Sequence, residues 1–204
     1  MVRSSDRYCG LRVAELGVAT GHFSHDFLKA SKNCVNRYYA IDTWRQQVNN
    51  YVDGNSWNNE GHHAHMAHAM QNLKTFWPHV SLIQEETVIA ARLLDDSSLD
   101  FVLIDARHDF CAVHAELRAY WRKLRPGGIM AGHDYLTHAE AIEQLGKMYD
   151  GHQDWRVCAN GTIRTGAVKG AVHEFASSLG LEVRRVFHLA FGHSPYWIMH
   201  KPPS

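Results

Sequence analysis

The chain has 204 residues, and its 21 basic and 21 acidic side chains leave it with no formal net charge. This length suits one domain with a well-buried core, and the neutral balance argues against nucleic acid as a partner. No apolar run approaches the roughly 20 residues that a membrane helix needs, and the N-terminal stretch lacks the apolar core of a signal peptide. We therefore expect neither a nucleic-acid nor a membrane partner.

Short apolar runs alternate with helix-like stretches, which is typical of βαβ units around a parallel sheet. The predicted strands, in chain order, are 12–16, 37–41, 80–83, 101–104, 129–131, 182–189 and 196–199. A helix is predicted from the turn at 17–21 to residue 30, and the further predicted helices are 62–76, 88–94, 111–124, 139–148 and 167–179. Residues 42–60 are polar and predict a long loop. The expected fold class is α/β: a doubly wound, Rossmann-like sheet of seven strands, mostly parallel, with a reversed C-terminal hairpin.

The cysteines are widely spaced and form no CxxC pair; they are Cys9, Cys34, Cys111 and Cys158. This spacing argues against a zinc knuckle and against a disulfide framework. We therefore expect no disulfide framework, a reducing compartment and a cytoplasmic location.

The first predicted strand ends in a glycine-bearing turn, VAELGVATGHFS. Gly17 and Gly21 let the backbone bend tightly and let a ligand approach without an intervening Cβ, and the next helix begins at the same place. About twenty residues further on, the second strand ends in Asp42, whose carboxylate can accept both ribose hydroxyls of a nucleotide-like cofactor. The GxxxG spacing differs from the GxGxxG of dinucleotide-binding turns. The alternative is a plain turn with Asp42 as a helix cap.

Two further strands of the predicted sheet end in groups that bind cations or move protons. Asp105 follows 101–104 and precedes His108, and the pair His133 and Asp134 follows 129–131. Ligands of an open α/β sheet collect at the carboxyl ends of its strands. These side chains therefore predict a hard-cation site and a base in one crevice. The ordinary pKa of histidine suits His108 to the role of general base; the alternative is a histidine on the surface or one that only supports a ligand of the site.

With these features in place, the chain resembles a known family. ELGVATG followed by AIDTW is similar to the first two motifs of class I S-adenosylmethionine-dependent methyltransferases. DFVLIDARHDF, KLRPGGIMAGHDY and GAVKGAVHEFASSLGL resemble the small-molecule O-methyltransferase branch, which includes catechol-type and macrolide-sugar-type enzymes that use a divalent metal. The resemblance runs from about residue 13 to residue 201, so it implies a single methyltransferase domain over 1–204. The short N-terminus also fits a domain of a longer protein.

The resemblance implies a cofactor-binding role for residues that follow the first three predicted strands. Glu15, Gly17 and Gly21 would line the methionine end of the cofactor, and Asp42 would hold the ribose. The adenine position falls on Glu86 and Thr87, just after the third predicted strand.

The resemblance also implies a metal site. Asp105 would meet both cofactor and metal, and His133 with Asp134 would complete the site. The expected cofactors are S-adenosylmethionine and a divalent metal, magnesium or manganese. The sequence departs from the family at Ala106, where glycine is usual, and at His133–Asp134, where catechol-type enzymes have Asp-Asn. His133 suits manganese, iron or zinc better than magnesium; the alternative is that it orients the loop through a backbone hydrogen bond.

Three aromatic residues of the predicted loop after the second strand are candidates for substrate contact: Trp44, Tyr51 and Trp57. If exposed beside the crevice, they would stack on a sugar or an aromatic ring; in a core they would be packing residues.

The function expected from all of these features is methyl transfer from S-adenosylmethionine to a hydroxyl of a small-molecule acceptor, with a sugar among the acceptors considered. One rival is a nucleotide-cofactor oxidoreductase, against which the glycine spacing argues. The other is a non-catalytic methyltransferase-like domain that serves binding or assembly. A homo-oligomer is compatible both with an enzyme and with a non-catalytic binding domain.

Overall fold

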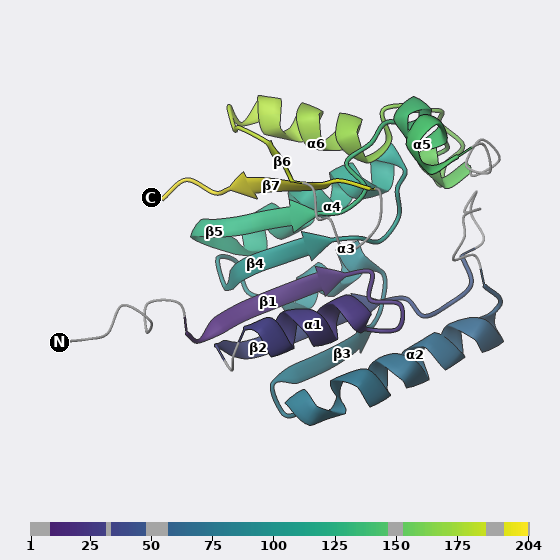
Figure 1. Ribbon diagram of the computed structural model, residues 1–204. Helices are drawn as coiled ribbons and strands as arrows, with labels where there is room; N and C mark the ends of the chain where they lie inside the picture. Colours follow the sequence, from purple (N-terminus) through teal and green to yellow (C-terminus); the bar gives the residue numbers. More distant parts are fainter. Residues whose placement is uncertain (1–8, 32–33, 48–56, 147–152, 187–193, 204) are drawn as a thin grey trace.

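The computed structural model describes residues 9–31, 34–47, 57–146, 153–186 and 194–203. Its centre is a seven-stranded sheet with the order β3-β2-β1-β4-β5-β7-β6 (Figure 1). The strands are β1 (Leu11–Leu16), β2 (Val35–Asp42), β3 (Val80–Gln84), β4 (Leu99–Ile104), β5 (Leu124–Gly132), β6 (Arg184–Val186) and β7 (Tyr196–His200). The α-helices are α1 (His22–Ala30), α2 (Asn59–Leu73), α3 (Thr87–Ala90), α4 (Phe110–Lys123), α5 (His138–Leu145) and α6 (Ala167–Ser178).

The strand directions confirm the predicted fold class. β3, β2, β1, β4 and β5 pair in parallel, and β7 pairs antiparallel with both β5 and β6. The sheet is therefore doubly wound and mostly parallel, with a reversed pair of strands at its C-terminal edge. Of the last two predicted strands, 182–189 corresponds to β6, although 187–189 lies outside the described residues.

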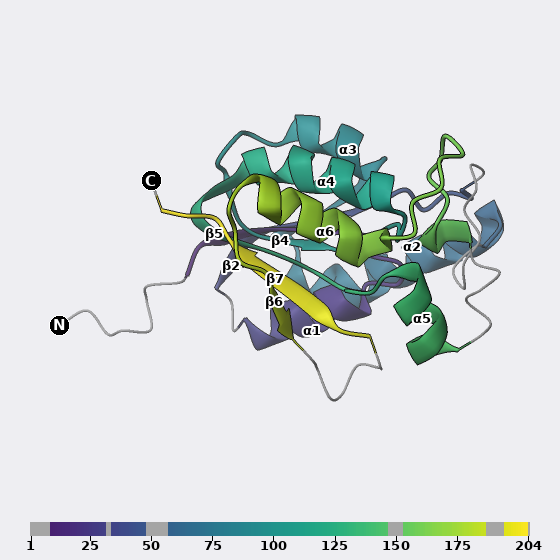
Figure 2. The same ribbon diagram turned by 90° about the horizontal axis from the view of Figure 1, so that it is seen from above.

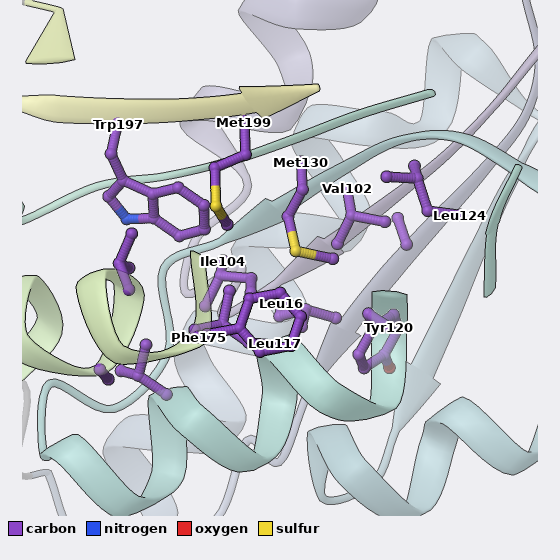
Figure 3. Close-up of a cluster of buried hydrophobic side chains, with 14 of the residues drawn as sticks. Leu16, Val102, Ile104, Leu117, Tyr120, Leu124, Met130, Phe175, Trp197 and Met199 are labelled. Atoms are coloured by element: carbon purple, nitrogen blue, oxygen red, sulfur yellow. The ribbon is translucent and has the colours of Figure 1, made fainter. Parts of the chain in front are cut away.

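Helices cover both faces of the sheet. α3, α4 and α6 lie along one face, and α1 lies on the other (Figure 2), where it packs with α2. α4 buries a stripe at helical spacing, Val113, Leu117 and Tyr120, against the sheet. These side chains belong to the larger core, together with Trp197 of β7 and Phe175 of α6. Figure 3 shows Leu117 beside Phe175 in this core. Burying each large apolar side chain stabilises the fold by about 1.5–3 kcal/mol, so this layer holds the carboxyl edge of the sheet in place.

Several element boundaries differ from the prediction, and two of them have local reasons. β5 begins at Leu124 rather than at residue 129, because Leu124 pairs with Leu99 of β4 ahead of the Pro126–Gly128 irregularity. α2 begins at Asn59, three residues before the predicted start at 62, because the Asn58 side chain accepts a hydrogen bond from the Gly61 amide at 2.9 Å and caps the helix.

The expectation that the cysteines form no disulfide framework is wrong. Cys9 pairs with Cys34, and Cys111 pairs with Cys158. Separations of 25 and 47 residues close because the fold brings the partners together: Cys9 lies two residues before β1, and Cys34 lies directly before the neighbouring strand β2. Since disulfides persist mainly in oxidising compartments, cysteine usage no longer supports the predicted cytoplasmic location. Across the described residues, every helix is too short or too polar to cross a lipid bilayer.

Candidate functional site

The strand register brings the predicted site residues to one edge of the sheet. Leu16 of β1 lies level with Ile41 of β2 and with Ile104 of β4, which in turn lies level with Gly132 of β5. The residue after each strand therefore follows at the same carboxyl edge. Backbone bonds continue the ladder there: the Asp105 amide donates to the Leu16 carbonyl at 2.8 Å.

The glycine turn fits tightly against the end of β4. Gly17 has a φ of +86°, and a Cβ built on it would lie 2.0 Å from the Asp105 carbonyl oxygen, so only glycine suits this position. Asp42 closes the turn from β2, because its Oδ2 accepts hydrogen bonds from the amides of Val18 and Ala19, both at 2.9 Å. Asp42 thus lies beside the turn, as predicted, and already orders it. Its role as a ribose ligand stays a prediction.

Glu15 and Gly21 brace the same turn. Glu15 is buried, and its Oε2 accepts hydrogen bonds from the Ser24 hydroxyl of α1 and from the Tyr38 hydroxyl of β2, the latter at 2.6 Å. Burial raises the pKa of Glu15 to about 8, and the two hydrogen bonds only partly offset this shift. Gly21, with a φ of +75°, is the N-cap residue directly before α1. Glu15 therefore ties the turn to α1 and β2 from below, while contact with a cofactor stays a prediction for both residues.

Glu86 and Thr87 lie after β3, at the start of α3. Glu86 is exposed, whereas Thr87 is buried and its hydroxyl donates to Oε1 of Glu116 at 2.5 Å. Burial raises the pKa of Glu116 to about 8, against the hydrogen bond from Thr87. Thr87 is thus anchored to α4, which fixes the position of the loop predicted to contact adenine.

Two carboxylates and two imidazoles meet after β4 and β5; we call Asp105, His108, His133 and Asp134 the acid–imidazole cluster. Asp134 Oδ2 lies 3.0 Å from Nε2 of His108 and 3.3 Å from Nδ1 of His133. His133 Nδ1 also lies 3.6 Å from Oδ1 of Asp105. Asp134 has a φ of +54°, a backbone conformation that a non-glycine residue adopts rarely and that is frequent at functional sites. The adjacency of these four residues is as predicted.

Attraction between the carboxylates and the imidazoles shifts the pKa values of the acid–imidazole cluster. Burial lowers the pKa of His133, but hydrogen bonds to Asp105 and Asp134 outweigh it and raise the value to about 10. Burial also opposes the charge on His108, yet the Asp154 carboxylate and the bond to Asp134 raise its pKa well above the ordinary value. Asp134 shows the converse, because its bonds from His108 and His133 outweigh burial and hold its pKa below the ordinary range. The neighbouring carboxylates therefore raise the pKa of His108 above the ordinary histidine value that suits a general base.

One residue of the site was missed by sequence analysis. Asp154 is fully buried and accepts a hydrogen bond from Nδ1 of His108 at 2.5 Å, although 46 residues separate the two. Asp154 follows no predicted strand and belongs to no motif, and 147–152 before it lie outside the described residues. No local pattern could have found it.

The predicted substrate aromatics have different fates. Trp44 follows the packing alternative: its side chain is fully buried in the core formed with α1 and α2, so it offers no exposed ring to a substrate, and its indole N–H donates to the Ala19 carbonyl at 2.9 Å. Burial of a large aromatic ring is favourable in free energy. The polar residues around Trp44 in the sequence do not indicate this burial. Trp57 is 48% exposed and packs edge-on against His65. Tyr51 lies outside the described residues.

Comparison with known proteins accounts for this arrangement. Residues 14–135 match the model of a family described as a methyltransferase domain. The chain belongs to this family. The match spans the second half of β1, the glycine turn, Asp42 and the acid–imidazole cluster. The resemblance to class I S-adenosylmethionine-dependent methyltransferases is therefore confirmed, and S-adenosylmethionine is the methyl donor that the family implies. A search of curated protein sequences gave no significant match.

Solved structures share the fold at low sequence identity. A protein from Corynebacterium glutamicum is 16% identical with a TM-score of 0.62, over 96% of this chain and 74% of its own. Cofactor-bound Rv0187 from MTB is 14% identical with a TM-score of 0.63, over 100% of this chain and 82% of its own. A Staphylococcus aureus protein named as a candidate caffeoyl-CoA O-methyltransferase is 15% identical with a TM-score of 0.59, over 93% and 76%. These likenesses show the fold.

Proposed function

We propose that this methyltransferase transfers the methyl group of S-adenosylmethionine to a hydroxyl oxygen of a small molecule, with a divalent cation held by the acid–imidazole cluster. One observation carries the proposal: Asp105 belongs to both halves of the site. Its backbone carbonyl forms the wall of the Gly17 turn, and its side chain lies 3.6 Å from His133 in the acid–imidazole cluster. A cofactor over the turn would therefore lie beside the groups that act on the acceptor.

The reaction needs alignment and the removal of one proton. In an in-line displacement the acceptor oxygen forms a bond to the methyl carbon as the carbon–sulfur bond breaks, and S-adenosylhomocysteine leaves. The hydroxyl proton has to pass to a base. The acid–imidazole cluster supplies both carboxylates and imidazoles at the carboxyl edge, where ligands of such sheets collect.

The donor atoms of the acid–imidazole cluster fit a divalent cation. One ligand atom from each of Asp105, His108 and Asp134 falls within 4.8 Å of the others, and His133 Nδ1 lies 3.3 Å from Asp134. Because the same His133 nitrogen also lies 3.6 Å from Oδ1 of Asp105, the ion would be held by Asp105, His133 and Asp134, and His108 is left to act as the base. Mixed oxygen and nitrogen donors suit manganese, iron or zinc better than magnesium. When bound, such an ion lowers the pKa of a coordinated hydroxyl and fixes its direction.

His108 is proposed as the base, at Nε2. Only neutral imidazole accepts a proton, and in the described arrangement Nε2 lies 3.0 Å from Asp134 Oδ2. The acceptor hydroxyl therefore has to take the place of Asp134 at Nε2. A cation bound by Asp134 favours this exchange, because it engages the carboxylate and lowers the pKa of the nearby imidazole.

A methyl-transfer assay tests the proposal. The chain is incubated with S-adenosylmethionine carrying an isotopically labelled methyl group and with catechol, caffeate or methyl glycosides, in the presence of manganese, magnesium or a chelator. We expect mass spectrometry to find the label on an acceptor oxygen, and the chelator to abolish transfer. Asp134→Asn should lose activity, whereas Asp95→Asn, an exposed site on the loop before β4, should keep it.

Two results would contradict the proposal. Transfer that survives exhaustive chelation would exclude the cation. Tight binding of S-adenosylhomocysteine without transfer to any acceptor would favour the non-catalytic alternative.

A further inference from the structure

His108 is held in place on two sides by one short segment. Asp154 Oδ2 accepts from Nδ1 of the ring at 2.5 Å and from the His108 backbone amide at 3.2 Å. The Trp155 ring stacks on the imidazole, with ring centroids 4.8 Å apart and planes 15° apart. Hydrogen bonds fix the ring in its own plane and stacking fixes its tilt, so the imidazole has one orientation.

The contact between Asp154 and His108 places a carboxylate in the protein interior, where its burial is costly. Asp154 is fully buried and Trp155 is 1% exposed. A carboxylate removed from water destabilises a fold unless cationic or hydrogen-bonding groups compensate it. Here His108 compensates Asp154 directly, and the Arg107 Nε lies 3.9 Å from the second carboxylate oxygen. The cost of burying the Asp154 carboxylate is therefore offset by its contact with His108.

A disulfide ties this segment to the site. Asp154 and Trp155 form a short 3-10 turn (Gln153–Trp155), and Cys158, just beyond it, is bonded to Cys111 in the first turn of α4. α4 begins directly after Asp109, on the same loop as His108. The cross-link thus joins the segment that carries Asp154 to the element that follows His108.

We propose that Asp154 is a positioning residue for His108, kept on the imidazole by the Cys111–Cys158 disulfide. The proposal rests on the proposed function, in which His108 Nε2 meets the acceptor. With Nδ1–H donated to Asp154, the ring is fixed so that Nε2 is directed to the position now held by Asp134, 3.0 Å away. A carboxylate on one imidazole nitrogen fixes both the ring orientation and which nitrogen is left for chemistry.

Nitrogen-15 NMR of the histidine rings tests this assignment without any acceptor. We expect a strongly downfield Nδ1 proton in the wild-type chain, which His108→Ala assigns by its disappearance. Asp154→Asn keeps the size of the side chain but removes its charge, so this resonance should disappear or move upfield. Asp95→Asn, the matched change on the exposed loop, should leave it in place. An unchanged Nδ1 resonance in Asp154→Asn would overturn the proposal.

The disulfide is tested by the same signal. In the double variant Cys111→Ser with Cys158→Ser, the downfield resonance should broaden or disappear; a sharp, unshifted resonance would remove the disulfide from the proposal. Titration of each variant with S-adenosylhomocysteine reports separately on the fold and the cofactor site. A wild-type chain that does not bind S-adenosylhomocysteine would refute the proposed function. The role of Asp154 is decided by the NMR result alone.

Discussion

Replacing Gly17 with alanine should be among the most damaging single changes to this chain. The new Cβ would lie 2.0 Å from the Asp105 carbonyl oxygen and 2.7 Å from the Ala106 Cα, and both are backbone atoms that cannot rotate away. The left-handed conformation costs an alanine about 1–2 kcal/mol, and overpacking costs about 1–3 kcal/mol more. The sum, about 2–5 kcal/mol, is a large part of the roughly 5–15 kcal/mol that stabilises an ordinary domain.

Gly161→Ala is the matched control. Gly161 has a φ of +83°, close to the +86° of Gly17, but a Cβ built on it has no atom within 4 Å. It should therefore lose only the conformational part, about 1–2 kcal/mol. Urea unfolding followed by circular dichroism measures both variants, and the difference in the free energy of unfolding isolates the contact with Asp105.

The same pair of variants tests the link between the turn and the cofactor. Relief of the contact must move the turn or the Asp105 backbone, so Gly17→Ala should also weaken binding of S-adenosylhomocysteine, whereas Gly161→Ala should not. Equal losses of stability in the two variants would refute the packing argument. Unchanged affinity in Gly17→Ala would show that the turn does not contact the cofactor.

Three further changes have defined outcomes. Asp42→Ala should weaken S-adenosylhomocysteine binding roughly 10- to 150-fold in calorimetry, from hydrogen bonds to a charged group worth about 1.5–3 kcal/mol; unchanged affinity would exclude a ribose ligand. The buried Glu116 has a pKa of about 8 against an ordinary 4.5, so its stabilising contribution is full below about pH 4.5 and is lost as pH rises through about 8. Glu116→Gln should reduce the fall in unfolding free energy over this range by up to about 1.4 kcal/mol per pH unit; an unreduced slope in urea unfolding would place the pKa elsewhere. His133→Ala should weaken manganese binding in calorimetry, and equal affinity would remove His133 from the ligand set.

The sequence predicts the features that depend on local pattern and sheet topology. Apolar runs mark the parallel strands, and strands of a parallel sheet end at a common edge. Asp105 and His133 could therefore be placed together although 28 residues separate them (133 − 105). Gly17 could be placed in a ligand-binding turn because such a turn after a strand has a characteristic pattern of glycines.

Contacts between distant, irregular segments could not be predicted. Asp154 reaches His108 from a segment without periodicity, so the pKa of His108 could not be inferred from its neighbours in sequence. The Cys111–Cys158 bond likewise depends on how the chain after α5 folds back onto α4. Trp44 could not be assigned to the core or to the surface from its polar loop, because its burial is decided by α1 and α2.

The most direct test of the central claim asks whether cofactor and cation share one site. Bound manganese broadens the NMR signals of nearby protons, so the chain is titrated with manganese in the presence of S-adenosylhomocysteine. We predict strong broadening of the cofactor protons next to sulfur in the wild-type chain and much weaker broadening in Asp134→Asn, with S-adenosylhomocysteine bound in both. Sharp cofactor signals in a wild-type chain that binds both manganese and S-adenosylhomocysteine would contradict the account.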